Sequence, residues 1–221
     1  TGTGKPFIDS YNWLKKMDDT RLVSYDRAEI DPEFNHIRHT DIIGYMYAPI
    51  IDIEKEHLPM NPKRPFIWVE CAHSMGNSTG NLKELWNFVR KEPRVQGGFI
   101  WDWIDQGVTI KTKKGEEYWG YGGDFEPEGK PHAGAFCLNG LIFPDRTIQP
   151  ALWEVKKQYQ SIHIKMINAN ELTFEAYNEN FFTNLSEYDL EWELLENGTK
   201  IKKGNLSLIA IPQAKVMFSL K

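Results

Sequence analysis

The sequence predicts an α/β domain followed by an antiparallel β-sandwich, and three observations lead to this prediction. Short apolar runs alternate with helical patterns up to about residue 158, which is typical of a parallel sheet. After that, apolar and polar residues alternate strictly, as at Leu172, Phe174 and Ala176, which indicates half-buried strands. An Asn197-Gly198 pair between two such segments predicts a two-residue hairpin. We therefore expect two domains, 1–158 and 159–221.

The first domain should contain two amphipathic helices and four strands. Phe7, Tyr11 and Leu14 lie at helical spacing. A second helix carries Leu82, Leu85, Trp86 and Val89 on one face, and Asn81 with Glu84 resembles a capping pair at its start. The predicted strands are 21–25, 42–47, 66–70 and 98–103. Four strands fit the second half of a TIM (β/α)₈ barrel.

The second domain should be a partial antiparallel β-sandwich of Ig-like or fibronectin type III style. Alternating strands carry Leu190, Trp192 and Leu194, and then Val216, Phe218 and Leu220. About 60 residues are present where ~100 are usual, so we expect a truncated domain. A half-barrel also leaves unpaired sheet edges, so we expect the chain to self-associate or to be poorly stable by itself.

Composition excludes several function classes. The net charge is −5, from 31 acidic and 26 basic residues, and it favours neither nucleic acid nor an anionic membrane surface. No apolar run approaches the ~20 residues of a membrane span. Cys71 and Cys137 are expected to be free buried thiols rather than a disulfide. The 8 Trp, 9 Tyr and 12 Phe suit either core packing or the stacking of sugar rings.

A candidate catalytic carboxylate, Glu70, closes the third predicted strand. In a (β/α)₈ barrel the carboxyl ends of the strands carry the chemistry, and a carboxylate there has no packing role. Glu70 is therefore a candidate nucleophile or acid/base. The alternative is a glutamate that caps the next helix or pairs with an arginine.

Four segments in order resemble the β-galactosidase branch of glycoside hydrolase family 2. They read E-x-A-H-x-M-G-N-S from Glu70, G-G-F-x-W-D-W-x-D-Q from Gly97, Y-G-G-D-F from Tyr121 and F-C-x-N-G-L from Phe136. Four ordered matches are far more specific than one short motif. The resemblance covers about residues 1–160, and it departs from the usual pattern at Cys71, where many relatives carry Tyr.

The resemblance assigns roles to the residues around Glu70. It implies that Glu70 is the nucleophile of a retaining glycosidase and that Tyr47 donates a hydrogen bond to it. His73 is similar to a histidine that binds a galactose hydroxyl. Trp101 is similar to the tryptophan that forms an apolar platform under the sugar, and Asn139 is similar to a residue of the same substrate site.

Metal ions are also implied by the resemblance. Phe136, through its carbonyl, and Asn139 match residues that hold sodium beside the galactose 6-hydroxyl. Magnesium is implied for the full-length enzyme, with ligands upstream of this chain. Asp102 and Asp105 are interpreted as hydrogen-bonding residues at the strand end rather than as a metal pair. Trp103 is interpreted as packing, and the Trp101–Asp102 peptide is expected to be cis.

The second catalytic carboxyl is expected to precede Thr1. In the family it is a Glu after Asn, ahead of a glycine-containing loop that residues 1–4 resemble. Asn170-Glu171 and Asn178-Glu179 lie in the sandwich pattern and are interpreted as strand and turn residues. Loss of a general acid/base costs roughly 10²–10⁴-fold in rate, so this chain alone is expected to be inactive.

The sequence thus predicts a fragment of a retaining β-galactosidase that acts on terminal non-reducing β-D-galactosides through a glycosyl-enzyme on Glu70. Its partners would be the substrate, the N-terminal part of the same polypeptide and further copies in a homo-oligomer. The alternatives are another family 2 glycosidase (β-glucuronidase or β-mannosidase) and a non-catalytic carbohydrate-binding module. A bacterial origin is implied, with cytoplasm and periplasm both open.

Overall fold

A computed structural model describes residues 3–27, 33, 37–61 and 63–220. It divides into two compact units, Thr1–Gln158 and Tyr159–Lys221, which are described separately. Residues 1 and 2 of the predicted glycine-containing loop lie outside the described residues. Within the described part, no helix combines the length and the apolar character that crossing a bilayer requires.

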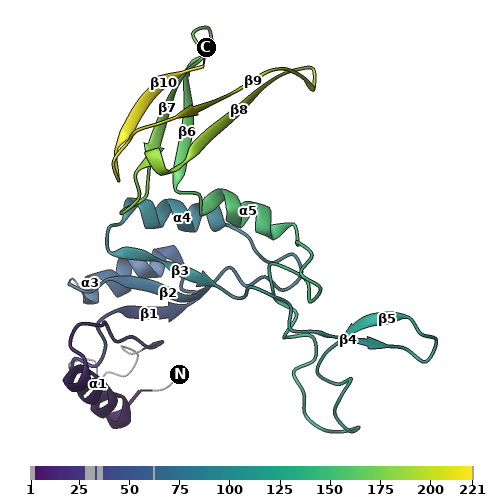
Figure 1. Cartoon of the computed structure of the whole chain (residues 1–221). Helices are drawn as coiled ribbons and strands as arrows, with labels where there is room; N and C mark the ends of the chain where they lie inside the picture. The colour runs from purple at the N-terminus through teal and green to yellow at the C-terminus, as the bar shows by residue number, and fades with distance from the viewer. Residues whose placement is uncertain (1–2, 28–32, 34–36, 62, 221) are drawn as a thin grey trace. The chain divides into compact units, whose positions relative to one another are not determined.

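Unit 1 is built on a three-stranded parallel sheet in the order β1-β2-β3 (Figure 1). The strands are β1 (Ile43–Met46), β2 (Phe66–Cys71) and β3 (Val95–Ile100). Phe66 of β2 pairs with Ile43 on one side and with Val95 on the other, so the three strands start level. Their carboxyl ends therefore meet at one edge, as a partial barrel of the α/β class requires.

The predicted strand 21–25 is wrong. Val23 N donates to the Asp41 carboxylate at 2.9 Å, and Val23 O accepts from Asp41 N at 2.7 Å. Its polar groups are thus taken by the loop residues Asp41 and Thr40 rather than by a strand ladder. The segment still lies beside β1, since Arg27 N donates to Gly44 O at 2.8 Å. The fourth predicted strand also ends earlier than expected, at Ile100 instead of residue 103.

Apolar side chains between the sheet and its helices form the core of unit 1. Trp68 is 1 % exposed, and its indole N–H donates to Ala48 O at 2.8 Å. Phe88 of α4 (Leu82–Lys91) packs in the same cluster. The predicted capping pair is wrong, because Asn81 is left-handed (φ 59°) and its side chain makes no capping hydrogen bond. α5 (Ala151–Gln158) lies along the same side of the sheet as α4, and Arg90 bonds Gln158 O at 2.9 Å.

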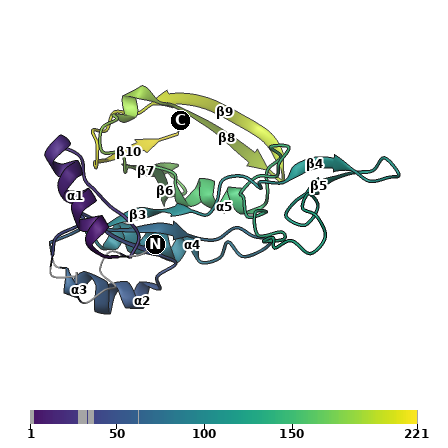
Figure 2. The same ribbon diagram turned by 90° about the horizontal axis from the view of Figure 1, so that it is seen from below.

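The other helices of unit 1 precede β1 or connect β1 to β2. α1 (Lys5–Met17) buries Tyr11, which donates to Asp41 at 2.8 Å. A continuous helical segment between β1 and β2 comprises α2 (Ile50–Asp52), a π-helix (Ile53–His57) and α3 (Leu58–Met60). The hairpin β4 (Val108–Lys111) and β5 (Glu117–Gly120) was not predicted, and it projects away from the sheet in both views (Figures 1 and 2).

Unit 2 contains two antiparallel sheets. One has the order β10-β7-β6, and the other pairs β8 with β9. The predicted hairpin is confirmed, because Glu196 pairs with Thr199 across Asn197 (φ 48°) and Gly198 (φ 83°), the positive φ values of a type I′ turn. The bounds are β6 (Ile162–Asn168), β7 (Thr173–Asn178), β8 (Asp189–Glu196), β9 (Thr199–Ser207), β10 (Lys215–Ser219) and a 3₁₀ turn (Leu185–Glu187).

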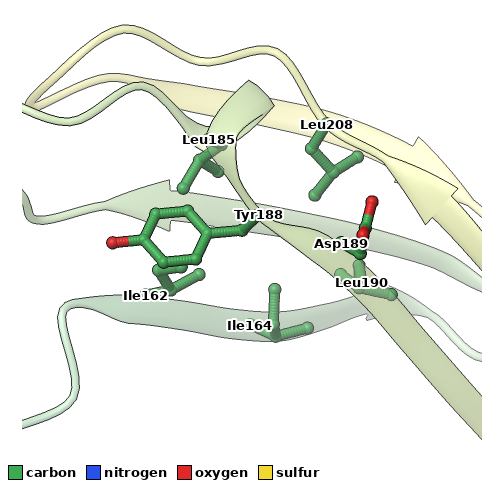
Figure 3. Close-up of a pocket in the computed structure, with 7 residues that line it drawn as sticks. All are labelled: Ile162, Ile164, Leu185, Tyr188, Asp189, Leu190 and Leu208. Carbon is green, nitrogen blue, oxygen red and sulfur yellow. The ribbon is translucent and has the colours of Figure 1, made fainter.

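An apolar pocket lies within unit 2 (Figure 3). Ile162 and Ile164 of β6 face Leu185, Tyr188 and Leu190 across it. It holds one carboxylate, Asp189, and no group arranged for catalysis, so it is a gap between the two sheets rather than a second active site. The predicted catalytic residues all belong to unit 1.

Candidate active site

Glu70 and Tyr47 meet at the carboxyl edge of the parallel sheet. Tyr47 directly follows β1, and Met46 pairs with Glu70 of β2. Tyr47 N donates to Glu70 O at 2.8 Å, and the phenol donates to Glu70 Oε2 at 2.7 Å. The left-handed backbone of Tyr47 (φ 52°) accompanies the turn at which the strand ends. The two residues predicted as a pair from different strands are thus in direct contact.

The environment keeps the proton on the Tyr47 phenol. Burial raises the pKa of Tyr47 well above its ordinary value of 10.0, and the hydrogen bond to Glu70 and the charge of Glu70 raise it further. Tyr47 is therefore a neutral donor, and Glu70 is the acceptor of a charge-assisted hydrogen bond. A carboxylate can act as a nucleophile through the oxygen that such a bond does not use.

His73 lies next to this pair. After β2 the chain turns at Ala72 (φ 46°), and the His73 ring comes to 6.0 Å from the Tyr47 ring, centroid to centroid. The ring centroid of Phe136 lies 5.5 Å from that of His73. His73 Nε2 is buried and bonds to none of the described residues. A buried ring nitrogen without a partner is costly, which fits a group that waits for a ligand hydroxyl.

Asn139 and Phe136 lie together in the loop that faces His73. Asn139 is 2 % exposed, and its Nδ2 donates to Phe136 O at 3.0 Å. Its Oδ1 is buried and makes no hydrogen bond to any residue that the structure describes. The predicted sodium ligands are therefore adjacent, and two oxygens, Phe136 O and Asn139 Oδ1, are of the type that hard cations bind. A cation held by both would need the amide turned so that Oδ1 faces the carbonyl.

Among the described residues, no three His, Cys, Asp or Glu side chains are grouped so as to hold a metal. The fit to a monovalent cation is therefore partial, because it rests on two oxygens of the right type. Asp102 and Asp105 do not form a metal pair, because Asp102 Oδ2 accepts from Gln106 at 2.6 Å, while Asp105 accepts from Gly140 N and Gln149.

Trp101 lies just beyond β3 at the same edge. Its backbone N–H donates to Cys71 O at 3.0 Å and its carbonyl accepts from Ser74 N at 2.8 Å, so it is fixed beside the residue that follows Glu70. Its indole is 39 % exposed, as a stacking surface must be. The Trp101–Asp102 peptide is cis, as expected. The packing role expected for Trp103 is wrong, since its side chain is 60 % exposed.

Sequence reasoning missed Gln149, which bonds Asp105 from 44 positions away at 2.9 Å. No local pattern marks it, because a hydrogen bond between distant segments leaves no periodicity in the sequence. It also missed Ser74, which is 2 % exposed and accepts from the Thr79 hydroxyl at 2.9 Å. Ser74 shapes the loop after His73, and its place inside a recognisable motif was the one signal that could have identified it.

Comparisons with known proteins identify relatives of both units. Residues 1–164 match the glycosyl hydrolases family 2, TIM barrel domain, and residues 174–221 match β-galactosidase, domain 4. A β-galactosidase of Aeromonas hydrophila is 36% identical over 233 residues, which is 100% of this chain and 22% of that one. A β-galactosidase of Priestia megaterium is 41% identical over 202 residues, 90% of this chain and 19% of that one.

A β-galactosidase of Vibrio vulnificus is 39% identical, with 94% of this chain and 21% of that one covered. The chain therefore spans about a fifth of these relatives. A solved Bacteroides uniformis β-glucuronidase aligns with a TM-score of 0.47 at 16% identity, over 97% of this chain and 27% of that one. Similarity at that level carries no information about substrate.

Proposed function

This chain belongs to glycosyl hydrolase family 2, and on that basis we propose that it carries the nucleophile side of the active site of a retaining β-galactosidase. The observation that carries the proposal is the 2.7 Å hydrogen bond from the Tyr47 phenol to Glu70 Oε2 at the carboxyl edge of the sheet. The matched relatives named β-galactosidase support the choice of galactose over other sugars.

In this proposal Glu70 attacks the anomeric carbon and forms a glycosyl-enzyme. Retaining glycosidases need a second carboxyl ~5–5.5 Å from the nucleophile to protonate the leaving oxygen and later to activate water. That acid/base comes from the part of the polypeptide that precedes Thr1. Tyr47 stabilises the carboxylate that Glu70 becomes again when the sugar leaves.

The sugar is held by groups near Glu70. His73 Nε2 bonds a hydroxyl, which gives this buried nitrogen its partner. The exposed Trp101 indole supports the apolar face of the pyranose. Sodium, held by Phe136 O and Asn139 Oδ1 with further ligands from upstream, would polarise a hydroxyl oxygen near these residues. Magnesium in the longer protein would be held by upstream residues, and its role would be electrostatic.

A chimera tests the proposal, because the chain spans only a fifth of its relatives. The chain replaces the matching segment of the Priestia megaterium relative, and cleavage of an aryl β-galactoside is measured. Glu70→Gln should lower kcat by at least about 10³-fold, because an amide is not a nucleophile. The matched control is Glu171→Gln, an exposed turn residue of unit 2, which should leave kcat unchanged.

A mechanism-based reagent identifies the nucleophile directly. A 2-deoxy-2-fluoro-galactoside with a good leaving group should label the chimera once, on the peptide that contains Glu70, as mass spectrometry will show. Label on any other carboxylate, or full activity in Glu70→Gln, would refute the proposal. Galactose binding by the isolated chain in calorimetry, together with an inactive chimera, would instead favour a carbohydrate-binding module.

A further inference from the structure

Two segments of unit 1 are joined by a dense set of hydrogen bonds next to the candidate site. One is 102–106, directly after Trp101, and the other is 137–142, which contains Asn139. Backbone bonds link them in both directions. Asp102 N donates to Asn139 O at 2.7 Å, Gln106 N to Cys137 O at 2.8 Å and Asp105 N to Ile142 O at 2.9 Å, while Leu141 N and Ile142 N donate to Trp103 O at 3.0 and 3.2 Å. The loop that carries Asn139 is therefore held on the carboxyl edge of the sheet.

One buried carboxylate stands at the centre of this junction. Asp105 is 7 % exposed, its Oδ1 accepts from Gly140 N at 2.7 Å, and its Oδ2 accepts from Gln149 Nε2 at 2.9 Å. No Lys or Arg among the described residues pairs with it. Burying a charge is costly unless it is well hydrogen-bonded, so both bonds are needed. Asp105 thereby connects three separate stretches of chain: its own, the one with Gly140 and the one with Gln149.

Gly140 allows the close approach on which this arrangement depends. A Cβ at Gly140 would lie 2.1 Å from Asp105 N and 2.2 Å from Ile104 C, which no real contact permits. The backbone of the loop therefore abuts the backbone after β3. The neighbouring Asn139 can then lie buried, bonded to Phe136 O, with the Phe136 ring 5.5 Å from the His73 ring.

We infer that Asp105 is a positioning residue for the sugar-binding end of the site. Its carboxylate bonds Gly140 and Gln149 rather than Glu70. It acts through Gly140 by fixing the loop with Asn139 and Phe136, whose ring lies beside that of His73, and through Gln149 by holding the chain that follows this loop. The inference rests on the proposed function, because the affected property is sugar binding. The nucleophile is left untouched, so its signature is a change in KM rather than in kcat.

Two substitutions at residue 105 separate its hydrogen bonds from its charge. In the chimera described above, Asp105→Ala removes both bonds and should raise KM for an aryl β-galactoside about 10- to 100-fold, the loss expected for a hydrogen bond to a charged group. We expect kcat to stay within about 3-fold. Asp105→Asn keeps the bond from Gly140 N. It also keeps a bond to Gln149 when the Gln149 amide turns so that its oxygen accepts from the asparagine amide. The KM of this variant should therefore stay near that of the parent.

Hydrogen exchange gives a readout that does not depend on activity. The Gly140 amide, which bonds Asp105 Oδ1, should exchange faster in Asp105→Ala and at the parent rate in Asp105→Asn. If Asp105→Ala does not fold, Gln149→Met removes one bond at similar volume and should raise KM about 3- to 10-fold. Asp145→Asn, at an exposed carboxylate that accepts from nearby Thr147, is the matched control and should change nothing.

Three results would overturn the inference. In the first, the Gly140 amide exchanges faster but KM is unchanged, which would make Asp105 a stabilising residue only. In the second, Asp105→Asn raises KM as much as Asp105→Ala, which would make its charge decisive. In the third, kcat falls and KM does not. If the proposed function itself is wrong, the Glu70→Gln chimera will retain activity. This outcome does not depend on the results for the Asp105 variants.

Discussion

Replacing Tyr47 with phenylalanine removes a single hydroxyl group, the one that donates to Glu70 Oε2 at 2.7 Å. In the proposed mechanism, Glu70 is an ester while the sugar is attached and then accepts a hydrogen bond weakly. When the sugar leaves, Glu70 becomes a carboxylate again and accepts strongly. Tyr47→Phe should therefore slow release of the sugar more than it slows attack by Glu70.

The magnitude follows from the hydrogen bond and its exposure. A bond to a charged group contributes about 1.5–3 kcal/mol, and 1.36 kcal/mol is tenfold in rate, which gives roughly 10- to 150-fold. Tyr47 is 43 % exposed, so water can replace part of the lost bond. We expect kcat to fall by about 10- to 30-fold in the chimera.

The assay compares aryl β-galactosides with good and poor leaving groups. With a good leaving group, release of the sugar limits turnover, so Tyr47→Phe should lower kcat and produce a burst of released phenol. With a poor leaving group, attack limits turnover, and the effect should shrink to a few-fold. An equal loss for both substrates, or an unchanged kcat with the good leaving group, would refute the assignment of the Tyr47 hydroxyl to this step.

Three further changes test the framework of the site. In Gly140→Ala, the added Cβ would clash with the backbone after β3, so the loop should move away and KM should rise at least tenfold in steady-state kinetics. A KM like that of the parent would show that the close approach is not required. Burial raises the pKa of the Cys71 thiol to about 11 from 9.0, so iodoacetamide at pH 7.5 should label Cys137 and spare Cys71 in peptide mapping. Because the folded pKa is the higher one, the stability contributed by Cys71 is present below pH 9 and lost as pH rises toward 11, and urea titrations of Cys71→Ala should lack that loss. Asp41→Asn should lower the free energy of unfolding by about 2 kcal/mol, since the side chain is bonded by Tyr11 and two cations; an unchanged urea midpoint would contradict this.

The stability due to Asp41 should also depend on pH. Burial alone would raise the pKa of Asp41, but hydrogen bonds from Val23 N, Tyr11, Arg38 and Lys15 outweigh it and hold the pKa below the ordinary 3.8. The folded pKa is the lower one, so this stability is present above pH 4 and is lost as pH falls below it. The difference in urea midpoint between the parent chain and Asp41→Asn should therefore shrink between pH 4 and pH 2.

Local sequence patterns predicted the parts of the fold that depend on a single segment. The apolar runs of β1, β2 and β3, the helix α4 and the Asn197-Gly198 hairpin follow from periodicity and turn chemistry. The resemblance added Tyr47 and His73. The position of Tyr47 beside Glu70 follows from the rule that parallel strands present their carboxyl ends at one edge, and His73 follows Glu70 just after β2. These features needed no knowledge of distant contacts.

Contacts between distant segments decided the rest. Residues 21–25 have the apolar content of a strand, yet the Asp41 side chain, 18 positions away, takes the backbone N–H of Val23. Asp105 stands in a recognisable motif, but its partners Gly140 and Gln149 lie 35 and 44 positions along the chain. A hydrogen bond across such a separation forms only when packing brings the segments together, and neither residue carries a local sign of the other. The sequence by itself therefore determined which side chains could do the chemistry, and the tertiary structure alone decided how the loop with Asn139 is held against them.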